Sequence, residues 1–287
     1  MTSNIHVITG PTIKFPLSQA FLIESDGEFL LVDPGCGRKT LFTWLKQHDI
    51  ELAQIDRLLI SHPHSDHVAI SKELVESNPH IRVMAHKEAI PLIESWELFK
   101  ASFVDLSPPE WEWWEKSVRE LTGFQNFSPV HEALTDGQRL RVGELTLEAL
   151  YTPGHAPGHL ALVCSELETL LPFDIDLTSF PFYGSKASDL EAFISSTNRL
   201  RELDVERAIS SHRRPLLHDE ITESFDIYLK KIVLREHRIS ALAEKGLSLD
   251  EIVERAPIYG KMINDAPILR KFEREMVRMH LEKLKVG

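Results

Sequence analysis

The sequence predicts an α/β protein in which strands and helices form layers. Between about residues 5 and 215, short apolar runs typical of strands alternate with segments of helical period. Two early runs are joined around Asp26-Gly27, a dipeptide favoured in tight hairpin turns. Beyond about residue 216 the chain is helix-rich and strongly charged. We therefore expect an α/β domain over residues 1–216 and a helical C-terminal domain over residues 217–287.

The N-terminal part of this pattern gives strands and helices in alternation. The hairpin is followed by Asp33-Pro34-Gly35 and then by a helical period through Leu41, Trp44 and Leu45. The strands expected here cover residues 20–24, 28–32, 57–60 and 81–85, and a helix is expected from about Asp66 to Ser77.

Residues 87–128 hold four of the five tryptophans of the chain, within helical patterns separated by Ser107-Pro108-Pro109. Ser107 is a natural N-cap with a proline after it, so we expect a helical insertion with a pair of helices. Large aromatic side chains pack a core or cover a ligand site equally well, and both interpretations stay open. Trp113 is our candidate substrate contact in this insertion.

A second sheet follows the insertion. Its strands are expected at residues 145–151, 161–164, 169–173 and 207–210, with a helix over about 188–203 before the last of them. In the C-terminal part, breaks are expected near Gly246 and at Pro257 and Pro267.

Composition excludes several classes of protein. The formal net charge of −12 over 287 residues argues against a sequence-independent nucleic-acid or anionic-membrane binder. The two cysteines, Cys36 and Cys164, form no CxxC, so a disulfide scaffold and a cysteine-based zinc knuckle are excluded. The first residues show no signal-peptide pattern and no apolar stretch is long enough to cross a membrane, so we expect a cytoplasmic protein.

Four ionisable side chains gather directly after the strand at 57–60, in His62-Pro63-His64-Ser65-Asp66-His67. Pro63 biases His62 towards an extended backbone, in which His62 and His64 point the same way and can hold one ion. Asp66 and His67 then face a neighbouring position, where the chain turns into the next helix. Imidazole and carboxylate without thiolate suit Zn²⁺, Fe or Mn²⁺.

One loop cannot complete two coordination shells, so further ligands are expected at other strand ends. His155, Asp174 and His212 each follow an apolar run, at residues 145–151, 169–173 and 207–210 respectively. Each of them is also an ordinary loop residue when it is taken alone.

In this order, from Asp33 through H-x-H-x-D-H to the last histidine, the chain resembles the metallo-β-lactamase superfamily over about residues 5–215. The resemblance implies a four-layered αββα sandwich with the site at the strand ends between two sheets. It implies that one divalent ion is held by His62, His64 and His155, and a second by Asp66, His67 and His212. Asp174 would bridge the two ions, and Asp33 would accept a hydrogen bond from a ligand imidazole.

Two departures from the family pattern leave alternatives open. The family usually has glycine before the bridging aspartate, whereas this chain has Phe173, and Asp176 competes with Asp174 for the bridging role. We favour Asp174 because it directly follows the apolar run. His159 likewise competes with His155, which we favour because Thr152-Pro153-Gly154 precedes it as in the family pattern.

The implied chemistry is hydrolysis by a hydroxide that bridges two metal ions, with zinc as the first choice and iron or manganese as alternatives. Asp66 is our candidate for proton handling, although coordination alone would also explain it. We expect a small ester, thioester or lactone as substrate, bound under the tryptophan-rich insertion. Arg213 and Arg214 are candidates for clamping a substrate carboxylate or phosphate, with simple solvent exposure as the alternative.

The C-terminal region is similar to the helical, winged-helix-like tail of the branch that includes glyoxalase II and the lactamase-beta-2 type. Some members of that branch cleave single-stranded RNA, so a phosphodiesterase remains the alternative, although the net charge of −12 makes a nucleic-acid partner unexpected. A metal-containing binding protein without catalysis is a second alternative. Whether the tail forms a homodimer or covers the active site stays open.

Overall fold

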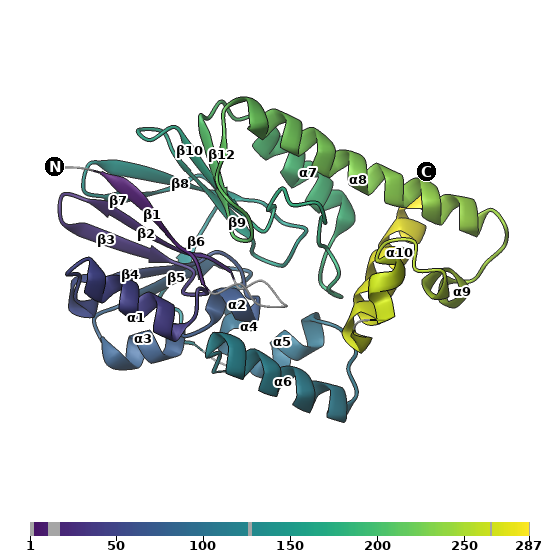
Figure 1. Ribbon diagram of the computed structural model, residues 1–287, viewed down its shortest axis with the longest axis horizontal. Coiled ribbons are helices and arrows are strands. Elements are labelled where there is room, and N and C mark those ends of the chain that lie inside the picture. The colour runs from purple at the N-terminus through teal and green to yellow at the C-terminus, as the bar shows by residue number, and fades with distance from the viewer. Residues whose placement is uncertain (1–2, 11–17, 126–127, 265, 287) are drawn as a thin grey trace.

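The structure is a computed structural model that describes residues 3–10, 18–125, 128–264 and 266–286. Two six-stranded sheets pack against each other, and helices cover the outer side of each (Figure 1). The four-layered αββα sandwich expected from the resemblance is therefore confirmed.

The first sheet contains the predicted hairpin and, beside it, parallel strands. The strand order is β1-β2-β3-β4-β5-β6. β2 and β3 pair antiparallel with Phe21 opposite Val32, and β3 to β6 run parallel. The bounds are β1 (Asn4–Ile8), β2 (Ala20–Ser25), β3 (Glu28–Val32), β4 (Arg57–Ile60), β5 (Arg82–His86) and β6 (Glu132–Leu134).

The second sheet is antiparallel except for one pair, β10 and β11, which run parallel. Its order is β12-β11-β10-β9-β8-β7. The bounds are β7 (Gln138–Val142), β8 (Leu145–Tyr151), β9 (Leu160–Cys164), β10 (Thr169–Phe173), β11 (Arg207–Ser210) and β12 (Leu216–Leu217).

Alternation along the strands explains why both faces of the first sheet are buried. Phe21 and Ile23 of β2 point into the core between the two sheets, whereas Leu22 points into a core beneath the outer helices. Successive side chains of a strand point to opposite faces of the sheet. A strand that is apolar throughout is therefore stable only when other elements pack on both faces. The sheet–sheet core also takes Leu171 and Phe173 from β10.

Helices of the N-terminal half cover the first sheet and form the insertion. They are α1 (Arg38–Gln47), the 3₁₀ helix η1 (Leu52–Gln54), α2 (Ser65–Val68), α3 (Ser71–Ser77), α4 (Ile90–Glu94), α5 (Trp96–Ser102) and α6 (Pro108–Thr122).

The prediction of a single helix from Asp66 to Ser77 is wrong, because Ala69 has a positive φ of 35° that separates α2 from α3. The insertion has three helices instead of two, and Ser107 caps α6 in a capping box with Glu110. Residues 126–127 of the predicted insertion lie outside the described residues.

The remaining helices are α7 (Leu190–Arg201), α8 (Asp219–Ala243), α9 (Leu249–Glu254), the 3₁₀ helix η2 (Gly260–Asn264) and α10 (Pro267–Val286). Phe225, Tyr228 and Met276 share one core with Phe193 of α7 and Leu170 of β10, so the C-terminal helices pack directly on the second sheet. The described residues after Leu217 form helices and no strand, so they contain no β-hairpin wing. Within the described chain, no helix is both long and apolar enough to cross a membrane.

Candidate metal centre

The loop after β4 brings its four ionisable side chains into one place. His64 has an extended backbone, with φ −65° and ψ 146°, and α2 begins at the next residue. His62 Nε2 and His64 Nδ1 consequently lie 3.1 Å apart, as expected for alternate residues of an extended loop. Gly35 packs against the Asp66 carbonyl so closely that a Cβ there would collide with it, which explains the glycine.

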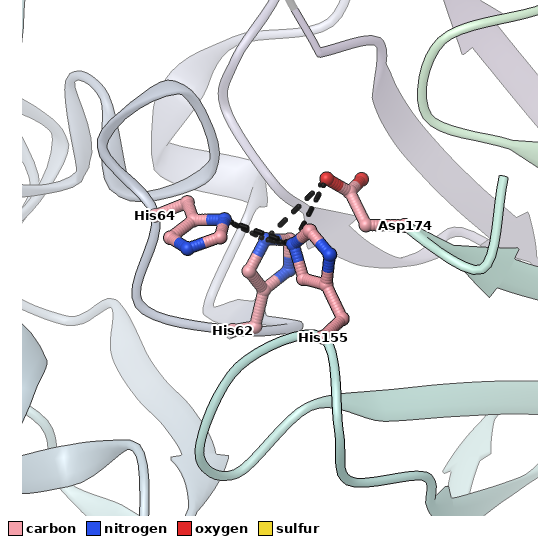
Figure 2. A group of neighbouring side chains, drawn as sticks. All are labelled: His62, His64, His155 and Asp174. Atoms are coloured by element: carbon pink, nitrogen blue, oxygen red, sulfur yellow. Dashed lines mark hydrogen bonds and ion pairs between the residues drawn. The ribbon is translucent and has the colours of Figure 1, made fainter. Parts of the chain in front are cut away.

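Residues from three strand ends form a first group with the potential to hold an ion: His62, His64, His155 and Asp174 (Figure 2). His155 Nε2 lies 2.9 Å from His64 Nδ1 and 3.2 Å from His62 Nε2. Asp174 Oδ2 is 3.3 Å from His155 Nε2. All four side chains direct a nitrogen or oxygen towards a common point, which is the arrangement that a metal ion requires.

Asp66, His67 and His212 form a second such group. The Nε2 atoms of His67 and His212 each lie 3.7 Å from Asp66 Oδ2. Asp174 faces this group too, because its Oδ1 is 3.1 Å from His67 Nε2 and 3.3 Å from His212 Nε2. The Asp174 carboxylate therefore stands between the two groups, one oxygen towards each.

The competing residues have other partners. Asp176 Oδ1 accepts hydrogen bonds from the Tyr228 hydroxyl at 3.2 Å and from the Thr178 amide at 3.1 Å. His159 Nδ1 is 2.8 Å from Thr152 Oγ1, and its Nε2 accepts a hydrogen bond from the Asp174 amide at 3.2 Å. Neither residue belongs to the two groups above.

Phe173, at the position where the family usually has glycine, adopts a left-handed φ of 48°. A bulky residue in this region costs about 1–2 kcal/mol relative to its preferred backbone. Its ring is fully buried in the sheet–sheet core and makes an edge contact with Phe21 at 5.8 Å between centroids. Burial of the aromatic ring offsets the backbone strain, so the turn into Asp174 forms without glycine.

The outer nitrogens of two of these histidines are fixed by hydrogen bonds. Asp33 Oδ2 is 2.8 Å from His67 Nδ1, and Asp33 also accepts hydrogen bonds from the amide and hydroxyl of Ser61 at 2.8 and 2.6 Å. The Phe182 carbonyl lies 2.9 Å from His155 Nδ1. An acceptor at Nδ1 holds the proton there and leaves Nε2 free as a ligand.

Besides His212 Nδ1, two buried atoms at the centre make no hydrogen bond, His67 Nε2 and Asp174 Oδ1. Buried polar atoms are normally paired, and these two face each other across the second group. Burial lowers the pKa of His62 and His64 well below its usual value, so both imidazoles are neutral. Burial would raise the pKa of Asp174, but the neighbouring His67, His212 and His62 hold it well below its usual range. Burial would lower the pKa of His67 and His212, but the facing Asp174 carboxylate raises that of His67 well above its usual range and that of His212 to about 9. A divalent cation takes the place of such protons when it binds imidazole ligands, so this ionised carboxylate between two pairs of histidines fits metal ions.

A cavity of about 510 Å³ opens onto both groups. Its polar end is formed by the candidate ligands, and its other walls are mostly apolar. These walls come from the insertion, from the loop after β10 and from the start of α10; they include Phe103, Trp113, Leu121, Phe180, Ile268 and Phe272. None of the described residues that line it is a lysine or an arginine.

Of the expected substrate contacts, the structure places Trp113 in the cavity wall and the two arginines elsewhere. Arg213 donates a hydrogen bond to the Leu177 carbonyl, and Arg214 pairs with Glu220 on the surface. The expectation of an arginine clamp is therefore not supported. Sequence reasoning missed Tyr228 and Phe182. Tyr228 reaches Asp176 from the distant α8, and Phe182 acts through its backbone carbonyl, so neither leaves a local pattern in the sequence.

Comparisons with known proteins agree with this geometry. The sequence profile of the metallo-beta-lactamase superfamily matches residues 14–212. The chain is 23% identical over 230 residues to the thioesterase pkgB of Emericella nidulans, covering 78% of this chain and 54% of that protein. It is 25% identical over 199 residues to the hydroxyacylglutathione hydrolase GloC of Haemophilus influenzae, covering 67% of this chain and 82% of that protein.

Among solved structures, a metallo-beta-lactamase family protein from Thermus thermophilus superposes with a TM-score of 0.76 at 22% identity, covering 98% of this chain and 93% of that one. This likeness concerns the fold. The family profile covers more than half of the chain and includes both groups of candidate ligands. The chain thus belongs to the metallo-beta-lactamase superfamily.

Proposed function

We propose that this protein is a metal-dependent hydrolase that cleaves an ester or thioester of an apolar carboxylic acid. The observation that supports this most directly is the apolar cavity that ends at the two groups of candidate ligands. The thioesterase and hydroxyacylglutathione hydrolase relatives support an acyl substrate. In the reaction, the oxygen of water bonds to the acyl carbon, the bond from that carbon to sulfur or oxygen breaks, and the leaving group takes up a proton.

We assign the two groups of side chains to a binuclear centre. His62, His64 and His155 would hold one ion and Asp66, His67 and His212 the other, with Asp174 shared between them. When bound, two divalent ions supply a water of lowered pKa and a positive charge opposite the developing oxyanion. Zinc suits this donor set, and so do iron and manganese.

The chain's own residues supply orientation, a proton acceptor and an environment that excludes water. Asp66 lines the cavity with a side chain 27% exposed, so its carboxylate is open to accept a proton from the attacking water. Asp33 and Phe182 fix the rings of His67 and His155. The aromatic walls bind the acyl group and keep bulk water away from the reacting carbonyl.

An RNA substrate is disfavoured by the same cavity. Backbone recognition of RNA requires cationic side chains, and the described lining of the cavity offers neither lysine nor arginine. Acyl hydrolysis therefore accounts for the site better than phosphodiester cleavage.

A hydrolysis panel tests the proposal. Metal-replete protein, with metal content measured, is incubated with straight-chain acyl thioesters, aryl esters, lactones, a β-lactam and single-stranded RNA. We expect turnover of esters or thioesters, a fall of about 100-fold or more in Asp66→Ala through loss of the proton acceptor, and no change in Asp204→Ala at an exposed carboxylate. RNA cleavage lost in Asp66→Ala without any acyl turnover would refute the proposal, and so would less than one metal per chain.

A further inference from the structure

A second cavity, of about 340 Å³, lies beside the metal cavity. Trp113 of α6 and Ile268 of α10 line both cavities. The other walls of the second cavity come from Leu106, Pro109, Glu110, Ala266 and Pro267. Because only these two side chains are shared, they form the partition between the two spaces.

The walls on both sides of this partition consist mainly of apolar side chains. Glu110 Oε2 accepts hydrogen bonds from the amide and hydroxyl of Ser107, so this oxygen is occupied by the capping box. The hydroxyls of Ser117 and Thr122, on the α6 wall of the metal cavity, donate to carbonyls of their own helix. The polar side chains that α6 contributes to these two walls are therefore each engaged within their own helix or its cap.

The two partition residues differ in how firmly they are held. Ile268 is 7% exposed and belongs to the apolar cluster that holds Phe99, Phe103 and Trp114. Trp113 is 47% exposed, so its indole contributes less to the core. Substitution of Trp113 therefore opens the partition without removing a buried side chain.

We infer that Trp113 and Ile268 set the longest straight-chain acyl group that the site accepts, and that the substrate carries such a group. This inference rests on the proposed function, since it places the acyl carbon at the metal centre. An acyl chain that starts there runs along the aromatic walls and meets the partition. A longer chain has to displace the Trp113 indole to reach the second cavity.

The test uses a length series of saturated straight-chain acids and their thioesters. Each methylene removed from water contributes about fourfold in affinity. For the wild type, kcat/KM of the thioesters and calorimetric affinity of the free acids should rise with length and then stop rising at one length. In Trp113→Ala both quantities should keep rising for at least two more methylenes. For the longest chain that the variant accepts, kcat/KM and affinity should then exceed the wild-type values by about 16-fold.

Leu121→Ala is the matched control. Leu121 is 37% exposed and lines the metal cavity but not the second cavity. This variant should keep the wild-type limit. An unchanged limit in Trp113→Ala, or the absence of any limit in the wild type, would overturn the inference even if thioesters are hydrolysed. If no thioester is hydrolysed but acid binding shows the limit and its shift, the proposed function fails, while the role of Trp113 and Ile268 in limiting the bound chain is supported.

Discussion

At the scale of single residues, the hydrogen bonds of the two ring nitrogens distinguish the candidate ligands His67 and His155 from the structural His159. His67 and His155 bond to an acceptor through Nδ1 and keep Nε2 directed at the centre. His159 uses both nitrogens, one with Thr152 and one with the Asp174 amide. It therefore has no nitrogen left for a metal, although its spacing in the sequence resembles that of His155.

We predict that Asp33→Asn weakens metal binding about 10- to 100-fold, because a neutral amide no longer fixes the His67 ring as a carboxylate does. The affinity is measured by competition with a chelating dye. Asp26→Asn is the control: Asp26 has a similar left-handed φ, 53° against 48°, but lies in the exposed hairpin turn. Equal affinities in the wild type and Asp33→Asn would show that the His67 ring needs no anionic partner.

The two aspartates after β10 should behave differently. Asp174→Asn is expected to reduce the metal content from two ions per chain to one or fewer, because an amide cannot offer an anionic oxygen to each group. Asp176→Asn should retain two ions, since its side chain bonds to Tyr228 and Thr178 instead. Metal content after reconstitution decides between them, and loss of an ion only in Asp176→Asn would assign the bridge to that residue.

At the scale of elements, α8 supports the loop that carries Phe182. The buried Arg235 donates a hydrogen bond to the Pro181 carbonyl, and its guanidinium lies 4.4 Å from the centroid of the Phe180 ring. The next carbonyl, that of Phe182, holds His155. Helix α8 is thus linked to the metal centre through two successive residues of one loop.

Replacement of Arg235 by methionine should lower the free energy of unfolding by about 1–3 kcal/mol, because the buried Pro181 carbonyl loses its charged donor. Metal affinity should fall as well, since the Phe182 carbonyl is less firmly placed. Urea denaturation and chelator competition measure the two effects. Lys231→Met, at an exposed position on the same helix, should change neither. A loss of stability without any loss of metal affinity would disprove the link.

At the scale of the whole molecule, the junction between the C-terminal helices and the body is a source of pH dependence. His280 of α10 is fully buried, with Nε2 2.9 Å from the Tyr183 hydroxyl and Nδ1 3.5 Å from Glu236. Burial lowers its pKa to about 4; Glu236 opposes this shift, and Arg235 and Lys283 add to it. Between about pH 6.5 and 4 the unfolded chain therefore binds the proton that the folded chain excludes.

Stability should consequently fall as the pH decreases through this window, by at most about 1.4 kcal/mol per pH unit from this residue. Urea denaturation at pH 7, 6 and 5 is compared for the wild type and His280→Gln, which keeps an acceptor for Tyr183 but does not titrate. The variant should show a shallower decline, while His237→Gln, on the exposed side of α8, should follow the wild type. If the free energy of unfolding declines equally with pH in the wild type and in both variants, the proton uptake does not occur at His280.

The sequence indicated most of the strands from local patterns, and its resemblance to the metallo-β-lactamase superfamily implied the order of the layers and the set of candidate ligands. Strands 57–60, 169–173 and 207–210 have the predicted bounds, because continuous apolar runs ended by polar or turn residues are a local signal. The ligand positions follow from the same signal, since each lies just beyond a strand that ends at one edge of a sheet.

Features that depend on residues distant in the chain became visible in the folded structure. It separated Asp174 from Asp176 and His155 from His159, placed Arg213 and Arg214 away from the cavity, and broke the expected helix at Ala69. It also brought α6 and α10 together as walls of one cavity and Tyr228 to Asp176. The physical reason is that hydrogen-bond partners and cavity walls arise from packing between elements, whereas strand and helix periods arise within one element.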